Sequence, residues 1–346
     1  MKFMSEEYRE KVYIIAEMSA NHGGDIKLAK EIIHKAADAG ADCIKIQTYT
    51  PDTLTIDCNS QYFHIGNGTW EGENLYQLYQ KAYTPWEWQE ELKREAENSG
   101  LDFLSTPFDR SAIDFLESIG IEFYKIASFE LVDIPLIRYT ASKRKPIILS
   151  TGMGTLAEIE RAISVIRDEG DNEIVLLKCA SAYPAVSDDM NLVTMKNMSE
   201  TFGVPVGLSD HSLGTVAAIT AVALGARVIE KHFCLSRTIK NPDSGFSMEP
   251  CEFKQMVQDI RAAERAIGSV HYGPTQQEVG SMIFRKSIFS VMDIKKGDMI
   301  TKENIRVIRP GYGLEPYYYQ ELIGQKALRN IKRGTPISFD MIGSIH

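Results

Sequence analysis

The stretch that decides the fold spans residues 204–233 and reads VPVGLSDHSLGTVAAITAVALGARVIEKHF. Apolar residues at 204–208 and 226–229 predict two strands, and residues 215–224 between them predict an amphipathic helix. A strand, a helix and a second strand in this order are typical of parallel, neighbouring strands. Each strand is followed by polar residues, SDH in one case and EKH in the other. The stretch therefore predicts a parallel sheet with polar side chains at the carboxyl ends of its strands.

The same alternation of strand and helix runs from residue 12 to about residue 265. Eight units with nearly continuous apolar strands favour a closed (β/α)8 barrel, the TIM barrel, over an open doubly wound sheet. The other strands are expected at residues 12–16, 43–47, 101–104, 123–126, 146–149 and 174–177, and further helices at 26–39, 86–98, 155–167 and 252–267.

The chain of 346 residues has room for such a barrel and a small appendage. The pattern changes after Gly268, so we expect the barrel in residues 1–268, a linker in 269–284 and a small domain in 285–346. Short strands are expected there at 287–291 and 305–309. A module of this size has little core, so we expect it to dock on the barrel or on a partner subunit. The insertion at residues 48–84 predicts a lid or hairpin over the barrel mouth.

Composition excludes several classes of protein. No apolar run is long enough to cross a membrane, and the charged N-terminus MKFMSEEYREK is not a signal peptide, so we expect a cytoplasmic protein without membrane contact. The five scattered cysteines favour free thiols over a disulfide framework. The net charge of −9 argues against nucleic-acid binding and means that an anionic substrate must be captured by a few well-placed cations.

Polar residues follow every predicted strand. Because the carboxyl ends of barrel strands meet at one face, these residues should converge on a single active site. They are Glu17, Gln47, residues 105–107, Ser128, residues 150–152, Ser181, residues 209–211 and residues 230–232.

Two of the seven histidines, His211 and His232, end successive strands and should reach the same rim. Two neutral imidazoles, with water or substrate oxygens as the remaining ligands, make an open metal site suited to Lewis-acid chemistry. The alternative is that each histidine only caps its strand by hydrogen bonding.

Lys45 and Lys125 lie within apolar strands, where an unpaired ammonium group is costly. We expect them to capture a phosphate and a carboxylate; the alternative is a structural salt bridge with Glu17 or Glu130. The loop STGMG at residues 150–154 supports anion capture, since a glycine-rich turn before a helix offers backbone N–H groups. Glu17 could hold a sugar hydroxyl or move a proton, or it could cap a helix.

Seven phrases in order and spacing resemble the sialic acid synthase family. They are IAEMSANHGG at 15–24, IKIQTYTP at 44–51, LSTPFD at 104–109, YKIASFE at 124–130, ILSTGMG at 148–154, GLSDHS at 207–212 and ALGARVIEKHF at 223–233. The tail phrases IKKGD, VIRPGYGL and NIKRGTPI resemble the antifreeze-like (SAF, β-clip) domain that follows the barrel in this family.

The resemblance implies phosphoenolpyruvate and an N-acylated amino sugar as substrates, and a divalent metal, manganese or magnesium. It implies metal ligation by His211 and His232, and a domain-swapped homodimer in which Arg309 reaches the partner's barrel. The position matches assign phosphoenolpyruvate contacts to Lys45, Thr106, Lys125, Ser128, Ser150 and Ser209, and sugar-side or catalytic roles to Glu17, Gln47, Tyr183 and Asp243. We also expect Glu130 and Ser181, at the same rim, to contact substrate.

The insertion and the phrase ASAYP at 180–184 resemble the pseudaminic acid synthase branch, in which the acceptor is a 2,4-diacetamido-2,4,6-trideoxy hexose. N-acetylneuraminate or legionaminate synthesis is the alternative within the family. Two other classes stay open: a Schiff-base aldolase that uses Lys125 or Lys45, and a sugar- or surface-binding protein built around the tail module.

Overall fold

The computed structural model describes residues 11–343. The chain forms two compact units that divide after Gly268. The prediction that the N-terminus is not a signal peptide concerns residues 1–10 for the most part, and these lie outside the described residues.

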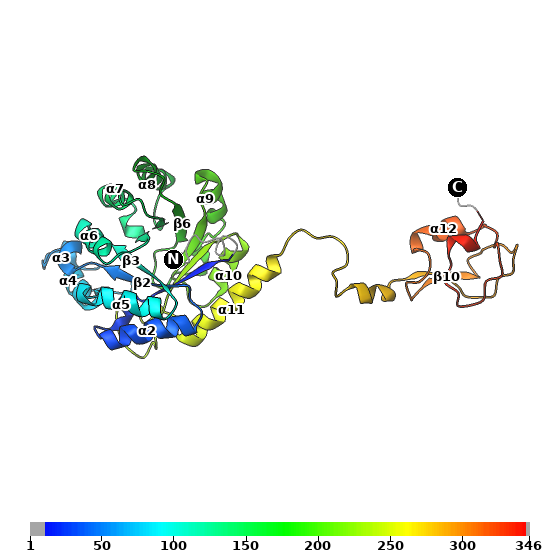
Figure 1. Ribbon diagram of the computed structural model, residues 1–346, viewed down its shortest axis with the longest axis horizontal. Helices are drawn as coiled ribbons and strands as arrows, with labels where there is room; N and C mark the ends of the chain where they lie inside the picture. Colours follow the sequence, from blue (N-terminus) through cyan, green and yellow to red (C-terminus); the bar gives the residue numbers. More distant parts are fainter. Residues whose placement is uncertain (1–10, 344–346) are drawn as a thin grey trace. The chain divides into compact units, whose positions relative to one another are not determined.

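The first unit contains an eight-stranded parallel sheet in the order β3-β2-β1-β8-β7-β6-β5-β4 (Figure 1). Strands β3 and β4, at the two ends of this order, also contact each other, so the sheet curls into a barrel. The prediction of a (β/α)8 barrel is confirmed. The strands are β1 (Tyr13–Glu17), β2 (Cys43–Thr48), β3 (Asp102–Pro107), β4 (Tyr124–Ile126), β5 (Ile147–Ser150), β6 (Ile174–Cys179), β7 (Val206–Asp210) and β8 (Val228–His232).

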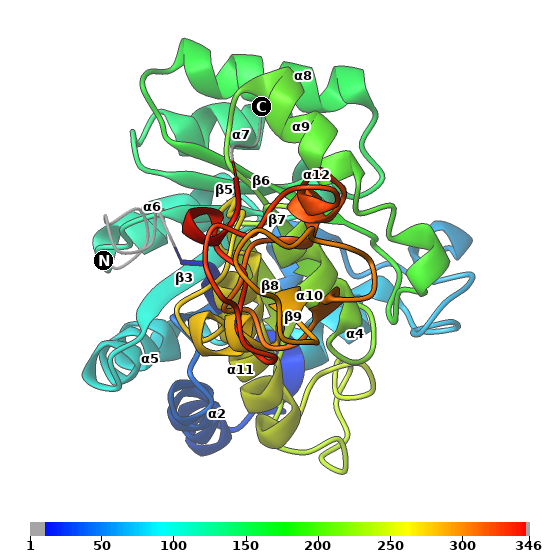
Figure 2. The same cartoon turned by 90° about the vertical axis from the view of Figure 1, so that its right-hand side faces the viewer.

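Helices connect the strands and cover the outside of the barrel (Figures 1 and 2). The helix predicted at 86–98 has these bounds in the structure, and the others that were predicted differ by one or two residues at their ends. The covering helices are α2 (Ile26–Asp38), α5 (Trp86–Asn98), α6 (Arg110–Ser118), α7 (Ile134–Ala141), α8 (Leu156–Asp168), α9 (Thr194–Phe202), α10 (Val216–Ala223) and α11 (Pro250–Ile267).

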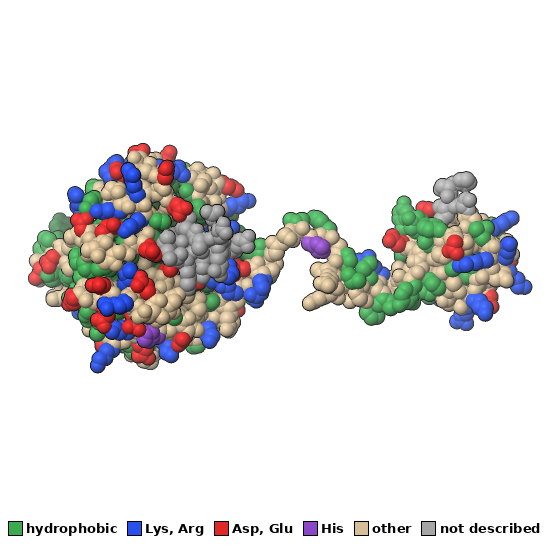
Figure 3. Space-filling view, in the orientation of Figure 1, with side chains coloured by type: hydrophobic (Ala, Val, Ile, Leu, Met, Phe, Trp, Pro, Cys, Tyr) green, Lys and Arg blue, Asp and Glu red, His purple; other side chains and the backbone are tan. Residues whose placement is uncertain are grey.

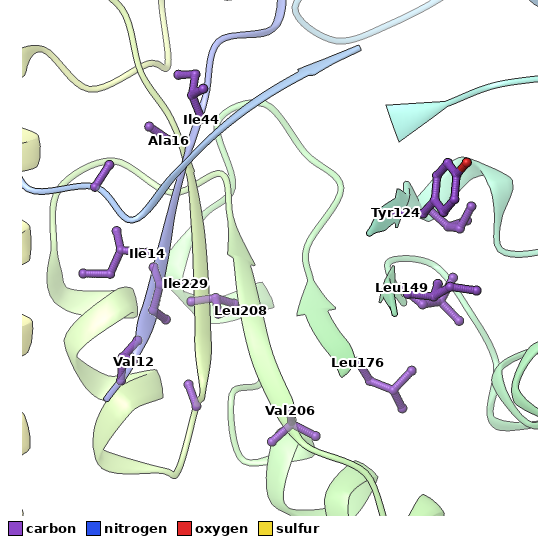
Figure 4. Close-up of a cluster of buried hydrophobic side chains, with 14 of the residues drawn as sticks. Val12, Ile14, Ala16, Ile44, Tyr124, Leu149, Leu176, Val206, Leu208 and Ile229 are labelled. Carbon is purple, nitrogen blue, oxygen red and sulfur yellow. The ribbon is translucent and has the colours of Figure 1, made fainter. Parts of the chain in front are cut away.

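Side chains alternate between the two faces of each strand, and both faces are buried. One apolar cluster consists of strand residues, among them Tyr13, Leu177 and Val228, together with Phe123 just before β4, and fills the barrel interior. The larger cluster joins the intervening strand residues, such as Leu208 and Ile229, to the helices (Figure 4). This alternation fixes which of the polar residues at each strand end point inward.

The insertion after β2 forms a hairpin, as predicted. Short helices α3 (Pro51–Leu54) and α4 (Leu75–Ala82) flank it, and an antiparallel bridge pairs His64 with Asn74. The indole Nε1 of Trp70 donates to the carbonyl of Pro242 at 3.0 Å, and the Thr69 hydroxyl donates to the carbonyl of Tyr183. The hairpin is therefore tied to the loops that follow β8 and β6, at the carboxyl-terminal face of the barrel.

The second unit has its own small core. Strands β9 (Ser287–Ser290) and β10 (Ile305–Ile308) pair antiparallel, and the short helix α12 (Tyr319–Leu322) packs its buried Leu322 into the same cluster. Apolar residues including Ile288, Ile294, Ile305 and Ile337 fill this core. Residues 269–284, which include a 3-10 helix at Val279–Phe284, are all exposed.

Charged side chains of both signs lie on the surface of the barrel unit (Figure 3). Basic and acidic side chains lie interspersed over the part of the barrel unit that Figure 3 shows. No helix among residues 11–343 combines the length and the apolar composition needed to span a bilayer. All five cysteines are free.

Candidate active site

Two buried lysines form the centre of the site at the carboxyl ends of the strands. Lys45, on β2, lies 2.9 Å from a carboxylate oxygen of Glu17 and donates to the Thr106 hydroxyl at 3.2 Å. Lys125, on β4, donates to the Ser150 hydroxyl at 2.6 Å. Both side chains point into the barrel because they share strand parity with the interior residues Cys43 and Phe123.

Glu230, on β8, lies between the two ammonium groups. One carboxylate oxygen is 3.3 Å from Lys45 Nζ, and the other is 4.0 Å from Lys125 Nζ. The Ser209 hydroxyl donates to Glu230 Oε1 at 3.4 Å. The salt bridge considered for Lys45, with Glu17, is present, but the one considered for Lys125 was wrong, because its ion-pair partner among the described residues is Glu230 rather than Glu130.

Sequence reasoning placed Glu230 at the active-site rim but assigned it no role. It stands two residues before His232 on the same strand, so strand alternation places both side chains on the inner face. That spacing is the signal that could have identified it.

The four charged groups have very different tendencies to ionise. Burial opposes the ionisation of Glu230, but Lys125 and Lys45 outweigh this and hold its pKa below the ordinary value. Burial raises the pKa of Glu17 to about 7, partly countered by Lys45 and reinforced by Glu230. Burial also lowers the pKa of Lys125 despite the neighbouring Glu230. For Lys45, burial is outweighed by Glu17 and Glu230, which raise its pKa.

The balance of charge in this cluster is positive when Glu17 is protonated. Two ammonium groups then face one carboxylate, Glu230, in a site from which bulk water is excluded. Interactions with charge are stronger in such surroundings than in water. The cluster is therefore able to accept an anion with two negatively charged ends, and the hydroxyls of Thr106 and Ser150 lie beside the two lysines as additional donors.

His211 and His232 lie next to each other at the ends of β7 and β8, with ring centroids 5.3 Å apart. The Nδ1 of His211 is 3.1 Å from the carbonyl oxygen of Ala180, which can only accept, so Nδ1 carries a proton and donates it there. Burial opposes the charged form of this imidazole, but Cys179 and the Ala180 carbonyl outweigh burial and raise the pKa of His211. Burial lowers the pKa of His232 well below its ordinary value, which keeps this imidazole neutral. Its Nδ1 is buried and makes no hydrogen bond with any of residues 11–343.

These properties fit a divalent metal held by two imidazoles. Neutral histidines with a free ring nitrogen are metal ligands, and a hydrogen bond from the other nitrogen to a backbone carbonyl is the usual means of orienting one. Within the described part of the chain, no group of three or more His, Cys, Asp or Glu residues is arranged as a metal cage. The remaining ligands would therefore come from water or substrate, as in a catalytic rather than a structural site.

Cys179, which ends β6, is a second residue that sequence reasoning did not select. Its Sγ lies 3.6 Å from His211 Nδ1 and 3.5 Å from the Ser181 hydroxyl. Burial opposes its ionisation, but His211 and the neighbouring hydroxyls lower the pKa of this thiol to about 7.

The loop after β5 approaches its neighbours so closely that a side chain cannot be accommodated at Gly152. A Cβ there would lie 2.1 Å from the Ser181 hydroxyl and 2.7 Å from that of Ser128. The expected N–H cradle is largely occupied, because Gly152 N donates to Ser128 Oγ at 3.1 Å and Gly154 N donates to the Thr151 carbonyl at 3.2 Å. The loop thus brings two serine hydroxyls together rather than presenting a row of free N–H groups.

An aromatic wall, formed by Trp70, Tyr183 and Phe246, lies beside the histidines. The ring centroids of Tyr183 and His211 are 4.2 Å apart, and those of Phe246 and His232 are 5.0 Å apart. Trp70, from the hairpin, contacts both other aromatic rings, at 5.4 and 6.2 Å. Sequence reasoning selected Tyr183 alone, since contacts between loops leave no periodic signal.

Three further predicted residues lie at the same end of the barrel. Gln47 donates to Glu17 Oε1 at 3.1 Å, which links it to the lysine cluster. Asp243 accepts from the backbone N–H of Ala20 at 3.0 Å, and burial raises its pKa. Burial also raises the pKa of Glu130 to about 7, although Lys125 partly counters this.

Arg309 is the only predicted site residue outside the first unit. It is exposed and follows β10 in the second unit. The other predicted residues all lie at the carboxyl-terminal face of the barrel, on strand ends or on the loops that follow them.

Comparisons with known proteins agree with this architecture. A model of the NeuB family matches residues 32–272, and a model of the SAF domain matches residues 285–343. The chain is 46% identical to the pseudaminic acid synthase of Helicobacter pylori, over 95% of this chain and 97% of that protein. It is 39% identical to the N,N'-diacetyllegionaminic acid synthase of Legionella pneumophila, over 95% of this chain and 94% of that protein.

Among solved structures, the chain is similar to N-acetylneuraminic acid synthetase from Leptospira borgpetersenii, with a TM-score of 0.70 and 32% identity over 79% of this chain and 90% of that one. The resemblance to sialic acid synthases that the sequence phrases indicated is confirmed. Because the family model spans most of the barrel and the relatives match nearly end to end, this chain belongs to the NeuB family and has a SAF domain at its C-terminus.

Proposed function

We propose that this protein is a pseudaminic acid synthase that acts in the cytoplasm. It condenses phosphoenolpyruvate with 2,4-diacetamido-2,4,6-trideoxy-L-altrose to give pseudaminic acid and phosphate. The observation that supports this most strongly is the cluster of two buried lysines around Glu230, next to the histidine pair. The cluster suits an anion with two charged ends, and the histidines suit an aldehyde oxygen that must be polarised.

Lys45 and Lys125 bind the carboxylate and the phosphate of phosphoenolpyruvate. The hydroxyls of Thr106 and Ser150 lie next to the two ammonium groups and complete the contacts with those oxygens. Held in this way, C3 of phosphoenolpyruvate attacks the aldehyde carbon of the open-chain sugar. Water then adds to C2 and phosphate leaves by cleavage of the C–O bond, which balances the reaction.

Glu17 moves a proton in this reaction. A carboxyl group with a pKa of about 7 is able to give and take protons near neutral pH, which is the condition for effective acid–base catalysis. It is 2.9 Å from Lys45, so it lies beside the bound anion. His211 and His232 would hold a divalent metal, Mn2+ or Mg2+, which supplies Lewis-acid polarisation of the sugar aldehyde.

The choice of acceptor rests on the relatives and on the aromatic wall. The chain is more similar to the pseudaminic acid synthase of H. pylori than to the legionaminic acid synthase of L. pneumophila. Trp70, Tyr183 and Phe246 provide apolar surface beside the histidines, which suits an acceptor with a methyl group at C6 and acetamido methyl groups. Synthesis of legionaminate or N-acetylneuraminate is the alternative.

Phosphate release from phosphoenolpyruvate, measured across a panel of acylated amino sugars, tests this proposal. We expect release with the trideoxy-L-altrose acceptor and little with N-acetylmannosamine or with the diacetamido acceptor of legionaminate. Preferred use of either of the other sugars would assign the chain to a different branch. Release with none of them would contradict synthase activity.

The lowered pKa of Lys125 keeps one other chemistry open, since a neutral amine can form a Schiff base. Borohydride reduction in the presence of substrates distinguishes the two. A synthase leaves no covalent adduct on Lys125, whereas an aldolase of this kind is trapped as a secondary amine.

Replacing Lys45 or Lys125 with methionine should raise the KM for phosphoenolpyruvate about ten- to a hundredfold, because a hydrogen bond to a charged group contributes roughly 1.5–3 kcal/mol. Each variant also leaves Glu230 with one cation fewer, so we expect a lower Tm. Calorimetric titration with phosphoenolpyruvate separates the two effects. Wild-type affinity in a destabilised variant would mean that the lysine is only structural.

We further propose that the SAF domain completes the active site of the partner subunit in a domain-swapped homodimer, with Arg309 as the contributed residue. Arg309 is exposed and lies in a module with its own small core, which leaves its guanidinium free for a ligand outside that module. The charged head of an arginine suits the carboxylate or hydroxyl groups of a bound sugar.

Mixing an Arg309→Ala protein with a His211→Ala protein should restore activity after subunit exchange. In a swapped heterodimer, one of the two sites has both an intact histidine pair and an intact arginine. If Arg309 served its own barrel, every site would contain one defect. Two different affinity tags allow the heterodimer to be isolated, and an inactive heterodimer would refute the swap.

A further inference from the structure

A buried ion pair lies directly behind the two histidines. Lys231, on β8, and Asp210, on β7, are opposite each other in the sheet register, and Lys231 Nζ is 2.6 Å from Asp210 Oδ2. Their side chains are 2% and 0% exposed. Asp210 immediately precedes His211, and Lys231 immediately precedes His232. The two charged side chains therefore lie level with the histidines along the barrel axis. They point outward, toward the helices, whereas the histidines point into the barrel.

The surroundings of the pair on that outer face are apolar. Leu208 and Ile229, two residues earlier on the same strands, belong to the layer between barrel and helices (Figure 4). On the other side of Lys231, its register partner on β1 is Ala16. Replacing a buried ion pair with well-packed apolar residues is often neutral or stabilising, so stability alone does not account for charges at these positions.

The contacts of the pair immobilise the backbone on both sides of His211. The second oxygen of Asp210 accepts from the backbone N–H of Ser212 at 2.9 Å and from its hydroxyl at 2.7 Å. Lys231 also donates to the carbonyl oxygen of Ser212. Residues 210 and 212 are thus both attached to a side chain of the next strand, and His211 lies between them. The ladder between β7 and β8 ends at this point, so on the β8 side the contacts of Lys231 continue the attachment. On the β6 side, the His211 carbonyl accepts from the backbone N–H of Ala185 at 2.9 Å.

We infer that Asp210 and Lys231 are positioning residues that hold the His211 and His232 imidazoles at a fixed separation. They do so through the backbone and do not touch substrate. For the role of those imidazoles in holding a divalent cation, the inference rests on the proposed function.

The test is a double variant, Asp210→Leu with Lys231→Met, which replaces the pair with apolar residues. We expect a Tm within a few degrees of the wild type, at least a tenfold weaker affinity for Mn2+ by electron paramagnetic resonance titration, and at least a tenfold lower kcat. The KM for phosphoenolpyruvate should change less than twofold, because Lys45 and Lys125 are untouched. Asp210→Asn, which keeps an oxygen for Ser212 but removes the charge, should shift Mn2+ affinity in the same direction if the double variant does not fold.

Arg261→Met is the matched control. Arg261 pairs with Asp42 at 3.1 Å, and Asp42 precedes β2 at the amino-terminal end of the barrel, away from the histidines. This variant loses a largely buried ion pair, so a lower Tm with unchanged Mn2+ affinity and kcat is expected. An equal loss of Mn2+ affinity in the control would overturn the positioning role, since any weakening of the barrel would then have the same result.

The histidine ring signals in metal-free protein, observed by NMR and assigned with the His211→Ala and His232→Ala variants, provide a readout that needs no metal. We expect single, sharp signals in the wild type and broadened or multiple signals in the double variant. A double variant with wild-type ring signals and Mn2+ affinity overturns the inference. A wild-type protein that binds no Mn2+ overturns the proposed metal instead, and the ring signals still decide whether the pair positions the histidines.

Discussion

Replacing His211 or His232 with alanine should reduce turnover about a thousandfold or more while the barrel stays folded. The two imidazoles are the donors for the proposed metal, and a Lewis-acid cation contributes several kcal/mol to the transition state. Both side chains point into the mouth of the barrel rather than into its apolar layers, so their loss removes little packing. The measurement is kcat with saturating substrates, together with Tm and circular dichroism of each variant.

Chelation provides an independent test of the same assignment. Treatment with EDTA should abolish activity, and added Mn2+ should restore it. His34→Ala is a suitable control for the His211 and His232 variants, because His34 is an exposed histidine on α2 that pairs with Glu95. Full activity of thoroughly chelated enzyme would show that the histidine pair acts without a metal.

Glu17→Gln should lower kcat about 10²- to 10⁴-fold, the usual contribution of a general acid or base. Gln cannot move a proton, but it keeps the volume of the side chain and can still contact Gln47 and Lys45. The wild-type pH–rate profile should contain an ionisation near pH 7 that is missing from the variant. A variant that keeps the wild-type rate and pH profile would assign Glu17 to binding alone.

The same carboxyl group should make the folded protein less stable as the pH rises. Its folded-state pKa of about 7 is above the ordinary value of 4.5, so the fold favours the protonated form. This contribution to stability is fully present below pH 4.5 and is lost as the pH rises through 7. The Tm of the wild type should therefore fall more steeply between pH 4.5 and 7 than that of Glu17→Gln. Glu130→Gln is the matched control for the loss of kcat. Burial raises the pKa of Glu130 to about 7 as well, but we expect this variant to lose less kcat than Glu17→Gln does.

The sequence was sufficient to predict the barrel because its signals are local. Each strand is a short apolar run and each helix an amphipathic one, and the polar residues at the strand ends follow directly in the chain. Except for β4, the barrel strands extend beyond their predicted carboxyl ends. Glu17, Ser150 and His232 belong to the ladders rather than to the loops, because parallel pairing continues into the polar residues.

Partners within the site were harder to predict, because they depend on register across strands. Lys125 pairs with Glu230 from a strand that lies across the barrel, whereas Glu130 is near it in sequence. The aromatic wall joins Trp70, Tyr183 and Phe246 from three separate loops, and no periodicity in the chain relates them. Motif resemblance identified Tyr183, but it gave no information about what that ring packs against.

The hairpin that holds Trp70 has a consequence for how acceptor preference could change. Both hydrogen bonds described for it end on main-chain carbonyls, of Pro242 and Tyr183, and every amino-acid sequence provides such acceptors. The groups proposed to hold phosphoenolpyruvate, in contrast, come from the rigid strands β2 and β4. Residues 58–74 could therefore be exchanged between homologues as a cassette, altering the range of sugars converted while the phosphoenolpyruvate half of the catalyst is inherited unchanged.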